Sequence, residues 1–302
     1  MRYLIELGRQ SLLCASEFVS LLRQKSDVHR TEALAPHILL VETQFPLEPD
    51  FFIELGGTIR VAASVQSLSS LSPAEVREYL HSALETGLID LGAEKVSFGL
   101  SVFPKEKRVK KILGSIADIC STLKEDLRRN GLSSRYIEPQ SGQTSLTSVQ
   151  IGENRVLDKG FEIVLVEAEQ EWLAGLTIWV QDYSGQTARD YERPHADPRS
   201  GMLPPKLARM IVNLARGPNA RTLLDPFCGS GGTLMEALLV GLSPTGMDRD
   251  FEAVRAARAN CEWLMERFNG SFPVPSFTQG DATEMRHYFE PLSFDAVATE
   301  PY

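Results

Sequence analysis

Cysteine is scarce in this 302-residue sequence, and long apolar runs are absent. The four cysteines, Cys14, Cys120, Cys228 and Cys261, are far apart and form no CxxC pair, which argues against a disulfide framework or a zinc site. No apolar run approaches the roughly 20 residues that span a bilayer, and polar residues interrupt the N-terminus, unlike a signal peptide. We therefore expect a cytoplasmic protein without metal or membrane anchor.

Positive charge is also lacking overall, because the formal net charge is −9. It is concentrated in residues 91–160, which hold 12 Lys/Arg against 8 Asp/Glu. Such clusters neutralise phosphates whatever the total charge, although on charge alone a solvated helix face is the better explanation. The cluster comprises Lys105, Lys107, Arg108, Lys110 and Lys111, then Lys124, Arg128, Arg129 and Arg135.

The order of predicted elements changes along the chain. Up to residue 181 the patterns predict mixed strands and helices, an α+β arrangement: a strand at 2–7, a helix at 11–23, strand–turn–strand over 51–65, helices at 72–86 and 109–129, and strands at 135–137, 145–151, 161–167 and 174–181. Residues 182–206 resemble an interdomain connection. From residue 207 strands alternate with helices, the last strand at 294–299, which predicts a parallel, doubly wound sheet.

A candidate ligand site follows the first strand of that sheet. The strand ends at Asp225, and the turn holds Gly229, Gly231 and Gly232 before a helix begins. Glycines let the backbone approach a ligand, and a helix N-terminus offers free N–H groups. Asp248 and Asp281 end the next two strands, at the sheet edge where open α/β folds bind ligands. Each acid alone also suits helix capping, and the absence of GxGxxG weighs against a dehydrogenase.

These residues resemble known motifs. DPFCGSGG (225–232) followed by GMDRD (246–250) is similar to the cofactor motifs of RNA methylases, and RDYERPHADPRSGMLPPKLARMIVNLA (189–215) is similar to the entry of the catalytic domain in archaeal-type tRNA guanosine-10 N2-methyltransferases. The resemblance implies S-adenosylmethionine as cofactor. The cofactor-binding residues that it implies are Asp225, Pro226, Gly229, Gly231, Asp248 and Asp281.

A second stretch, residues 135–166, resembles the end of the THUMP domain of the same family, an RNA-binding module. The resemblance implies a ferredoxin-like domain at 1–65, THUMP at 66–168, a linker at 169–206 and a Rossmann-like class I methyltransferase domain at 207–302. It also implies tRNA as partner and favours the RNA interpretation of the basic cluster. We therefore predict RNA contacts from Lys105, Lys107, Arg108, Lys110, Lys111, Arg128 and Arg129.

The catalytic motif is expected after the fourth strand. Amine methylases of planar bases place D/N-P-P-Y/F there: an acceptor and a proline carbonyl bind the amine hydrogens, and an aromatic ring stacks on the extruded base. This sequence reads Thr299-Glu300-Pro301-Tyr302. Without a gap Thr299 takes the acidic position; with one deletion Glu300 takes it, Pro301 supplies the carbonyl and Tyr302 the ring. We favour the second alignment, because the chemistry needs an acceptor.

Three further interpretations stay open. A complete methyltransferase sheet in this family has about seven strands, and this sequence predicts only four of them. We therefore predict that the methyltransferase domain is incomplete and the sequence a fragment. An amino-methyltransferase acting on rRNA or DNA would have the same cofactor half. An RNA-binding protein without catalysis is the alternative from another class. The number of methyl groups added and the oligomeric state are left open by the sequence.

Overall fold

The structure, a computed structural model, describes residues 1–25, 28–89, 91, 95–105, 109–196, 203–268 and 270–301. The chain divides into two compact units, each assembled from separate segments. Unit 1 consists of residues 1–9, 28–46 and 58–181, and unit 2 of residues 10–27, 47–57 and 182–302.

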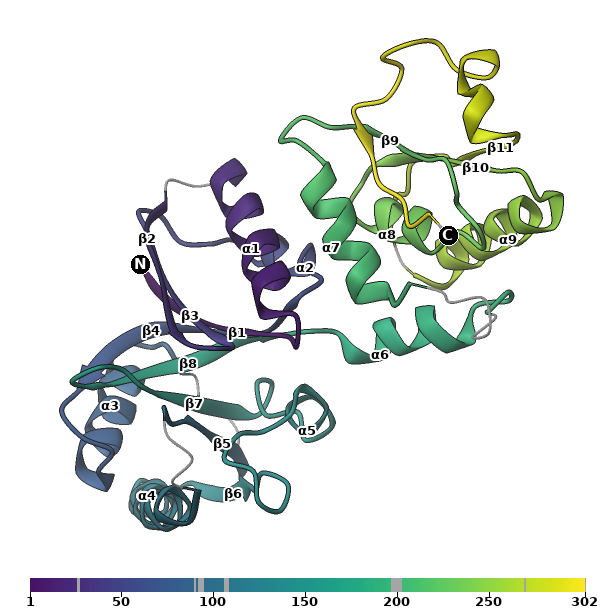
Figure 1. Ribbon diagram of the computed structural model, residues 1–302. Helices are drawn as coiled ribbons and strands as arrows, with labels where there is room; N and C mark the ends of the chain where they lie inside the picture. The colour runs from purple at the N-terminus through teal and green to yellow at the C-terminus, as the bar shows by residue number, and fades with distance from the viewer. Residues whose placement is uncertain are drawn as a thin grey trace. The chain divides into compact units, whose positions relative to one another are not determined.

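Unit 1 contains a sheet of eight strands in the order β2-β3-β1-β4-β8-β7-β5-β6 (Figure 1). Its pairs are antiparallel except that β5 runs parallel to both β6 and β7. The strands are β1 (Arg2–Leu7), β2 (Val28–Ala35), β3 (Ile38–Thr43), β4 (Thr58–Leu68), β5 (Lys95–Phe103), β6 (Ser133–Ile137), β7 (Gly160–Glu167) and β8 (Trp172–Val180).

Among the described residues of unit 1, three helices accompany the sheet: α3 (Pro73–Glu85), α4 (Val109–Arg129) and α5 (Ser148–Glu153). α3 begins as predicted, with the Ser72 side chain accepting from the Glu75 N–H. Helices α3 and α4 lie side by side (Figure 1) and share one apolar core with β5 and β7. That core contains Tyr79, Leu80, Phe98, Ile119, Leu123 and Phe161.

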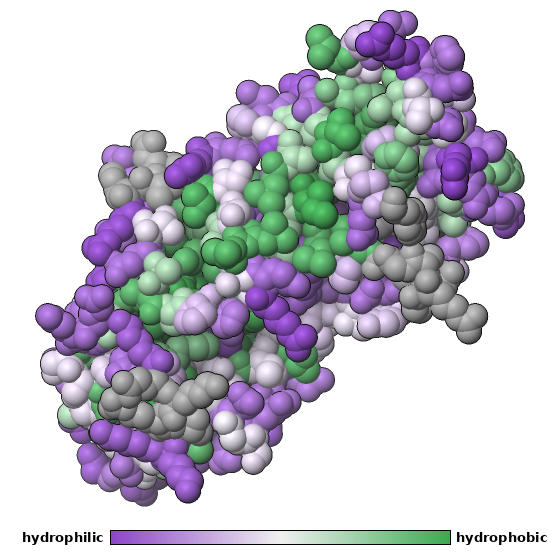
Figure 2. Space-filling model, viewed as in Figure 1, coloured by the Kyte–Doolittle hydropathy of each residue, from purple (hydrophilic) through white to green (hydrophobic). Residues whose placement is uncertain are grey.

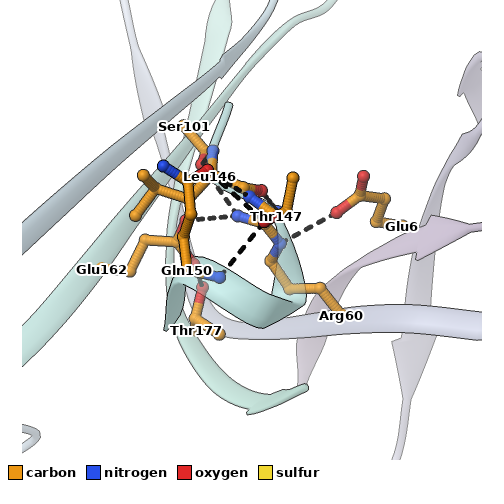
Figure 3. A network of polar contacts seen from close by, with 8 residues as sticks. All are labelled: Glu6, Arg60, Ser101, Leu146, Thr147, Gln150, Glu162 and Thr177. Carbon is orange, nitrogen blue, oxygen red and sulfur yellow. Dashed lines mark hydrogen bonds and ion pairs between the residues drawn. The ribbon is translucent and has the colours of Figure 1, made fainter. Parts of the chain in front are cut away.

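A buried ion network also connects the strands of unit 1 (Figure 3). Arg60 on β4 is 1% exposed. Its guanidinium contacts Glu162 on β7, and its Nε donates to Glu6 on β1 at 2.9 Å. Its Nη1 donates to Ser101 on β5 at 2.8 Å, and its Nη2 donates to the Leu146 carbonyl at 2.5 Å. Burial raises the pKa of Glu6 although Arg60 acts against it. One arginine therefore satisfies acceptors from three strands and a loop.

Unit 2 contains a four-stranded parallel sheet in the order β11-β10-β9-β12, together with helices (Figure 1). The strands are β9 (Thr222–Asp225), β10 (Ser243–Asp248), β11 (Ser276–Gln279) and β12 (Ala296–Val297). The helical elements are α1 (Ser11–Lys25), α2 (Pro49–Ile53), α6 (Tyr183–Thr187), the π-helical turn η1 (Ala188–Glu192), α7 (Pro205–Ala215), α8 (Gly232–Leu239), α9 (Phe251–Arg267) and the 3-10 helix η3 (Ala282–His287).

Helix α1 packs on α7 within unit 2, and buried polar contacts connect the two. Glu17 of α1 accepts from Asn213 of α7 at 2.6 Å and from the N–H groups of Gly56 and Gly57 at 2.8 Å. Burial raises the pKa of Glu17 while these donors lower it. Segments 10–27 and 47–57 thus belong with residues 182–302, although the predicted ferredoxin-like domain includes them.

Several sequence predictions are corrected. The strand predicted from Phe51 is helix α2, in which Pro49 occupies the first turn and Phe51 and Phe52 are both buried; strand residues would alternate between faces. The strand predicted at 145–151 is largely helix α5, because Thr147 and Gln150 form a capping box. The predicted strand at 294–299 is only two residues long, and the predicted connection contains α6 and η1.

The division into four domains stays a prediction. Among the described residues, no helix is long and apolar enough to cross a membrane. The same residues contain no group of three His, Cys, Asp or Glu side chains that could hold a metal ion.

Candidate cofactor and catalytic site

The turn after β9 requires its glycines. Gly231 has φ +83°, a left-handed conformation that side chains disfavour, and a Cβ there would lie 3.0 Å from the Ala257 backbone of α9. The Gly231 N–H donates to the Cys228 carbonyl at 2.8 Å, and the Cys228 N–H donates to the Met247 carbonyl of β10 at 2.9 Å. The turn is therefore held between α9 and β10.

Asp225 lies beneath this turn. It is 2% exposed and accepts from the Phe227 N–H at 3.1 Å. Burial raises the pKa of Asp225 to about 6; the hydroxyls of Thr299 and Thr233 lower it, and the charge of Asp248 raises it. Asp225 was predicted to bind cofactor, but the structure places it under the turn and outside the pocket lining.

The raised pKa predicts a pH-dependent stability that Asp225→Asn should remove. A carboxyl whose pKa is higher in the folded than in the unfolded state favours folding at low pH. Its contribution therefore declines as the pH rises from its ordinary pKa of 3.8 to about 6. We expect the unfolding free energy of the wild type, relative to Asp225→Asn, to fall by roughly 2–3 kcal/mol between pH 3.5 and 7.

The measurement is urea unfolding at several pH values, followed by the fluorescence of Trp263 in unit 2. Trp172 and Trp179, which lie on β8 of unit 1, are first replaced by Phe in both proteins. All other acids are present in both proteins, so their contributions cancel in the difference between the two unfolding free energies. A difference that does not change with pH would contradict the assignment.

Asp248 ends β10 beside the turn. Its Oδ2 accepts from the Gly229 N–H and its Oδ1 from the Asp250 N–H, each at 3.0 Å. Each carboxylate oxygen has two lone pairs, so both oxygens keep capacity for a ligand hydroxyl. Asp248 is half-buried, and its two backbone bonds fix the direction of the remaining lone pairs.

A pocket of about 670 Å³ opens at the carboxyl edge of the sheet. It brings together four of the six predicted cofactor residues: Pro226, Gly229, Asp248 and Asp281. Asp281 is exposed and caps η3, accepting from Thr283 N–H at 2.8 Å and Thr283 Oγ1 at 2.7 Å, which lowers the pKa of Asp281. The other lining residues are Phe227, Ser230, Arg249, Asp250, Ala253, Gly280, Ala282 and Thr283.

Sequence reasoning missed Asn260 on α9. Asn260 is fully buried; its Nδ2 donates to the Ser230 carbonyl at 2.8 Å and to the His195 carbonyl at 3.1 Å, and its Oδ1 accepts from the His195 N–H at 2.9 Å. The Asn260 side-chain amide thus connects the glycine turn to the segment at His195. The sequence feature that could have identified Asn260 is a polar residue on the apolar face of α9, beside Ala257 and Cys261.

A second missed feature is the buried carboxylate of Glu236 on α8. The Glu236 carboxylate accepts hydrogen bonds from Arg189 Nε at 2.6 Å and from Arg209 Nε at 2.7 Å. All three side chains are buried. This network joins η1 and α7 to the helix that follows the glycine turn.

The predicted catalytic residues follow β12, the neighbour of β9. The Ala298 N–H donates to the Leu224 carbonyl at 3.1 Å, which continues the pairing beyond β12. Thr299 is half-buried and its hydroxyl lowers the pKa of Asp225, whereas Glu300 and Pro301 are exposed. Tyr302 lies outside the described residues. The motif therefore stands at the same sheet edge as Asp225, with Glu300 accessible.

The predicted RNA-binding residues are divided between the two ends of α4. Lys110 and Lys111 are exposed in its first turn, and Arg128 and Arg129 in its last. A rise of 1.5 Å per residue separates these ends by roughly 27 Å. Lys105 is exposed just after β5, and Lys107 and Arg108 lie outside the described residues. Arg129 is paired with Glu125 at 2.5 Å.

Comparison with known proteins adds a family match to this geometry. Residues 193–301 match the family model described as UPF0020, an RMKL-like methyltransferase domain. The similarity to a methyltransferase domain covers these residues.

Curated relatives of the methyltransferase domain carry one name, tRNA (guanine(10)-N2)-dimethyltransferase. The relative from Pyrococcus abyssi is 38% identical over 115 residues, which is 37% of this chain and 30% of that protein. The relative from Methanothermobacter thermautotrophicus is 44% identical over 116 residues, 38% of this chain and 31% of that protein. The aligned part thus covers about a third of each relative.

Solved structures extend the likeness to the whole fold. The crystal structure of TrmN from Thermus thermophilus has a TM-score of 0.56 and 16% identity, covering 100% of this chain and 79% of that one. A possible methylase from Clostridium difficile 630 has a TM-score of 0.53, also at 16% identity, over 100% of this chain and 80% of that one. At such identities the likeness shows the fold alone.

Proposed function

We propose that the protein to which this chain belongs transfers a methyl group from S-adenosylmethionine to the N2 amine of a guanosine in tRNA, at position 10. The observation that carries this is the pocket bordered by Gly229, Asp248 and Asp281 at the carboxyl edge of the parallel strands. The name shared by the relatives of the methyltransferase domain supports the choice of tRNA and guanine.

The lining residues fit an adenosyl cofactor. The turn presents Gly229 and Ser230 without a bulky side chain, so backbone approaches the ligand closely. Asp248 offers acceptor lone pairs to the two ribose hydroxyls, and Asp281, with one oxygen engaged by Thr283, offers the other to the adenine amine. When bound, S-adenosylmethionine supplies an electrophilic methyl group.

The residues after β12 act on the acceptor base. A guanine amine is a weak nucleophile because its lone pair is delocalised into the ring. The Glu300 carboxylate and the Pro301 carbonyl accept its two hydrogens and so localise the lone pair on nitrogen. Fixing the amine at the pocket makes the encounter effectively unimolecular, which supplies much of the acceleration. The target base must first leave its stack.

Calorimetric titration of the chain with S-adenosylmethionine tests the cofactor proposal. We expect the wild type to bind S-adenosylmethionine. Asp248→Asn should have a dissociation constant roughly 10- to 100-fold larger, because a hydrogen bond to a charged group contributes about 1.5–3 kcal/mol. Asp250→Asn, a neighbouring exposed acid in the same pocket, should change affinity less. Heat from NAD, or none from S-adenosylmethionine, would refute the proposal.

The substrate proposal is tested with the full-length gene product. Defined tRNA transcripts, an rRNA fragment and duplex DNA are incubated with labelled cofactor, and the modified base is mapped by nuclease digestion and mass spectrometry. We expect N2-methylguanosine at position 10 of tRNA. Label in rRNA or DNA alone would favour the corresponding amino-methyltransferase, and cofactor binding without transfer to any of them would contradict guanine methylation.

A further inference from the structure

One fully buried polar side chain, that of Asn260 on α9, contacts the glycine turn of the cofactor pocket. Hydrophilic residues cover much of the surface in Figure 2, whereas Asn260 is 0% exposed. Its neighbours on the helix, Ala257 and Cys261, are also fully buried and belong to an apolar cluster with Leu234. A polar group in such surroundings is costly unless its hydrogen bonds are made. The partners of Asn260 therefore indicate its role.

The first partner is the peptide that joins Ser230 to Gly231, which is bonded at both of its ends. The Ser230 carbonyl accepts from Asn260 Nδ2 at 2.8 Å, and the Gly231 N–H donates to the Cys228 carbonyl at 2.8 Å. Because a peptide unit is planar, these two bonds together fix its orientation. Gly231, with φ +83°, has no side chain to restrict rotation. Without Asn260 the bond at the carbonyl end would be lost, and the peptide would be less firmly oriented.

The second partner lies 65 residues before Asn260 in the chain. Asn260 Oδ1 accepts from the His195 N–H at 2.9 Å, and Nδ2 also donates to the His195 carbonyl at 3.1 Å. A side-chain amide has an acceptor oxygen and two N–H donors, so it can pair with both main-chain groups of His195 and still reach Ser230. A side chain with only donors or only acceptors could not serve all three groups.

The order of strands indicates which part of the cofactor meets the glycine turn. Strands β11, β10 and β9 are neighbours in the sheet, and each lies about 4.8 Å from the next. In the proposed binding mode, Asp281 after β11 binds the adenine amine and Asp248 at the end of β10 binds the ribose. The part of S-adenosylmethionine beyond the ribose then lies at the turn that follows β9.

We propose that Asn260 is a positioning residue for the cofactor: by orienting the Ser230–Gly231 peptide, it sets the affinity of the pocket for the part of S-adenosylmethionine beyond the ribose. This inference rests on the proposed function, which makes S-adenosylmethionine the ligand. Ser230 lines the pocket, whereas Asn260 lies outside the lining, so its effect passes through the turn. Binding of adenosine, which ends at the ribose, should not depend on Asn260.

The test compares two labelled ligands, S-adenosylmethionine and adenosine, by equilibrium dialysis against the 302-residue chain. Asn260→Ala removes the amide, and Asn260→Leu replaces it with a branched side chain that neither donates nor accepts. We expect each variant to raise the dissociation constant for S-adenosylmethionine about tenfold, the effect of one lost hydrogen bond, and that for adenosine less than about twofold. General damage to the pocket would weaken both ligands alike, so the ratio of the two dissociation constants separates positioning from destabilisation.

Asn213→Ala is the matched control. Asn213 on α7 is also 0% exposed in unit 2, and its Nδ2 donates to Glu17 at 2.6 Å and to the Glu54 carbonyl at 2.8 Å. Neither partner lines the cofactor pocket. We expect this variant to unfold at a lower urea concentration, as the loss of a buried hydrogen bond requires, while both dissociation constants stay within about twofold of the wild type.

A second measurement uses the wild type alone and decides the matter if both Asn260 variants fail to fold. Coupling between two sites is reciprocal, so a cofactor that depends on Asn260 through Ser230 should also stabilise the bond of Asn260 to the His195 N–H. We expect saturating S-adenosylmethionine to slow hydrogen exchange of the His195 amide, followed by NMR, by the same factor of about ten. Saturating adenosine should leave that exchange rate unchanged.

Three results would overturn the positioning role while the chain still binds S-adenosylmethionine. They are equal weakening of both ligands by Asn260→Leu, an equal ratio in Asn260→Leu and Asn213→Ala, and exchange at His195 that does not respond to the cofactor. Absence of adenosine binding by the wild type would contradict the assignment of ribose and adenine to Asp248 and Asp281, and this inference with it. Failure of the wild type to bind S-adenosylmethionine would instead refute the proposed function.

Discussion

Replacing Arg60 by alanine should lower the unfolding free energy of unit 1 by about 3–5 kcal/mol. Removing one partner of a buried ion pair leaves the other charge without compensation. Glu162 is 0% exposed and would retain only the hydroxyl donors Ser101, at 2.6 Å, and Thr177, at 2.5 Å. The Leu146 carbonyl would also lose its donor. Because Arg60 connects β1, β4, β5 and β7, the loss affects the centre of the sheet (Figure 3).

Urea unfolding followed by Trp172 and Trp179 fluorescence measures this effect once Trp263 of unit 2 is replaced by Phe in every variant, because Trp172 and Trp179 lie on β8 of unit 1. Arg155→Ala is the control: it removes an ion pair with Asp158 at 2.9 Å whose side chains are 61% and 60% exposed, and should cost less than about 1 kcal/mol. Adding Glu162→Gln to Arg60→Ala should restore part of the stability, since the uncompensated charge is gone. Equal stability of Arg60→Ala and Arg155→Ala would show that the buried network contributes nothing.

Replacing Glu300 by alanine should lower the turnover of the full-length gene product on tRNA by about 10²–10³-fold, within the range of a positioned proton acceptor. Glu300 is exposed at the sheet edge beyond β12 and lies outside the lining of the cofactor pocket. The dissociation constant for S-adenosylmethionine should therefore stay unchanged. Glu300→Gln keeps an acceptor oxygen and should retain more activity than Glu300→Ala.

Single-turnover methylation of a tRNA transcript, with cofactor affinity measured in parallel, tests this prediction. Thr299→Val separates the two alignments of the motif: the Thr299 hydroxyl lowers the pKa of Asp225, so we expect its loss to affect stability more than chemistry. Glu290→Ala, an exposed acid of the same unit, is the matched control. If Thr299→Val abolishes turnover while Glu300→Ala is active, the ungapped alignment is correct and Thr299 holds the acceptor position.

Local patterns predicted most elements because their signals lie within a few residues. Helix α4 has the predicted bounds, Val109–Arg129, and β9 has the predicted bounds Thr222–Asp225. Where the prediction failed, two signals competed over a short distance. At Phe51 two adjacent aromatic residues predicted a strand. The segment forms a helix instead, because Pro49 begins it and because both aromatic rings are buried. At 145–151 the capping box of Thr147 and Gln150 outweighed the apolar run.

The position of the candidate site could be predicted from the sequence, because the order of parallel strands determines where their carboxyl ends meet. Acids that end successive parallel strands meet at one edge, and Asp248 and Asp281 do share a pocket there. The depth of each side chain was not predictable. Asp225 and Asp248 look alike in sequence, yet the first is buried under the turn and the second borders the pocket, because the strand–turn geometry directs their side chains differently.

The sequence by itself determined the chemistry of the glycine turn, the carboxylates around it and the order of strands and helices that place them, since these depend on backbone conformation and short-range spacing. Only the tertiary structure decided which distant residues complete them. Asn260 reaches Ser230 and His195, Glu236 binds two arginines from other helices, and Glu17 joins α1 to α7. A buried polar side chain must find its partners wherever packing brings them, and those partners stand up to 196 residues apart.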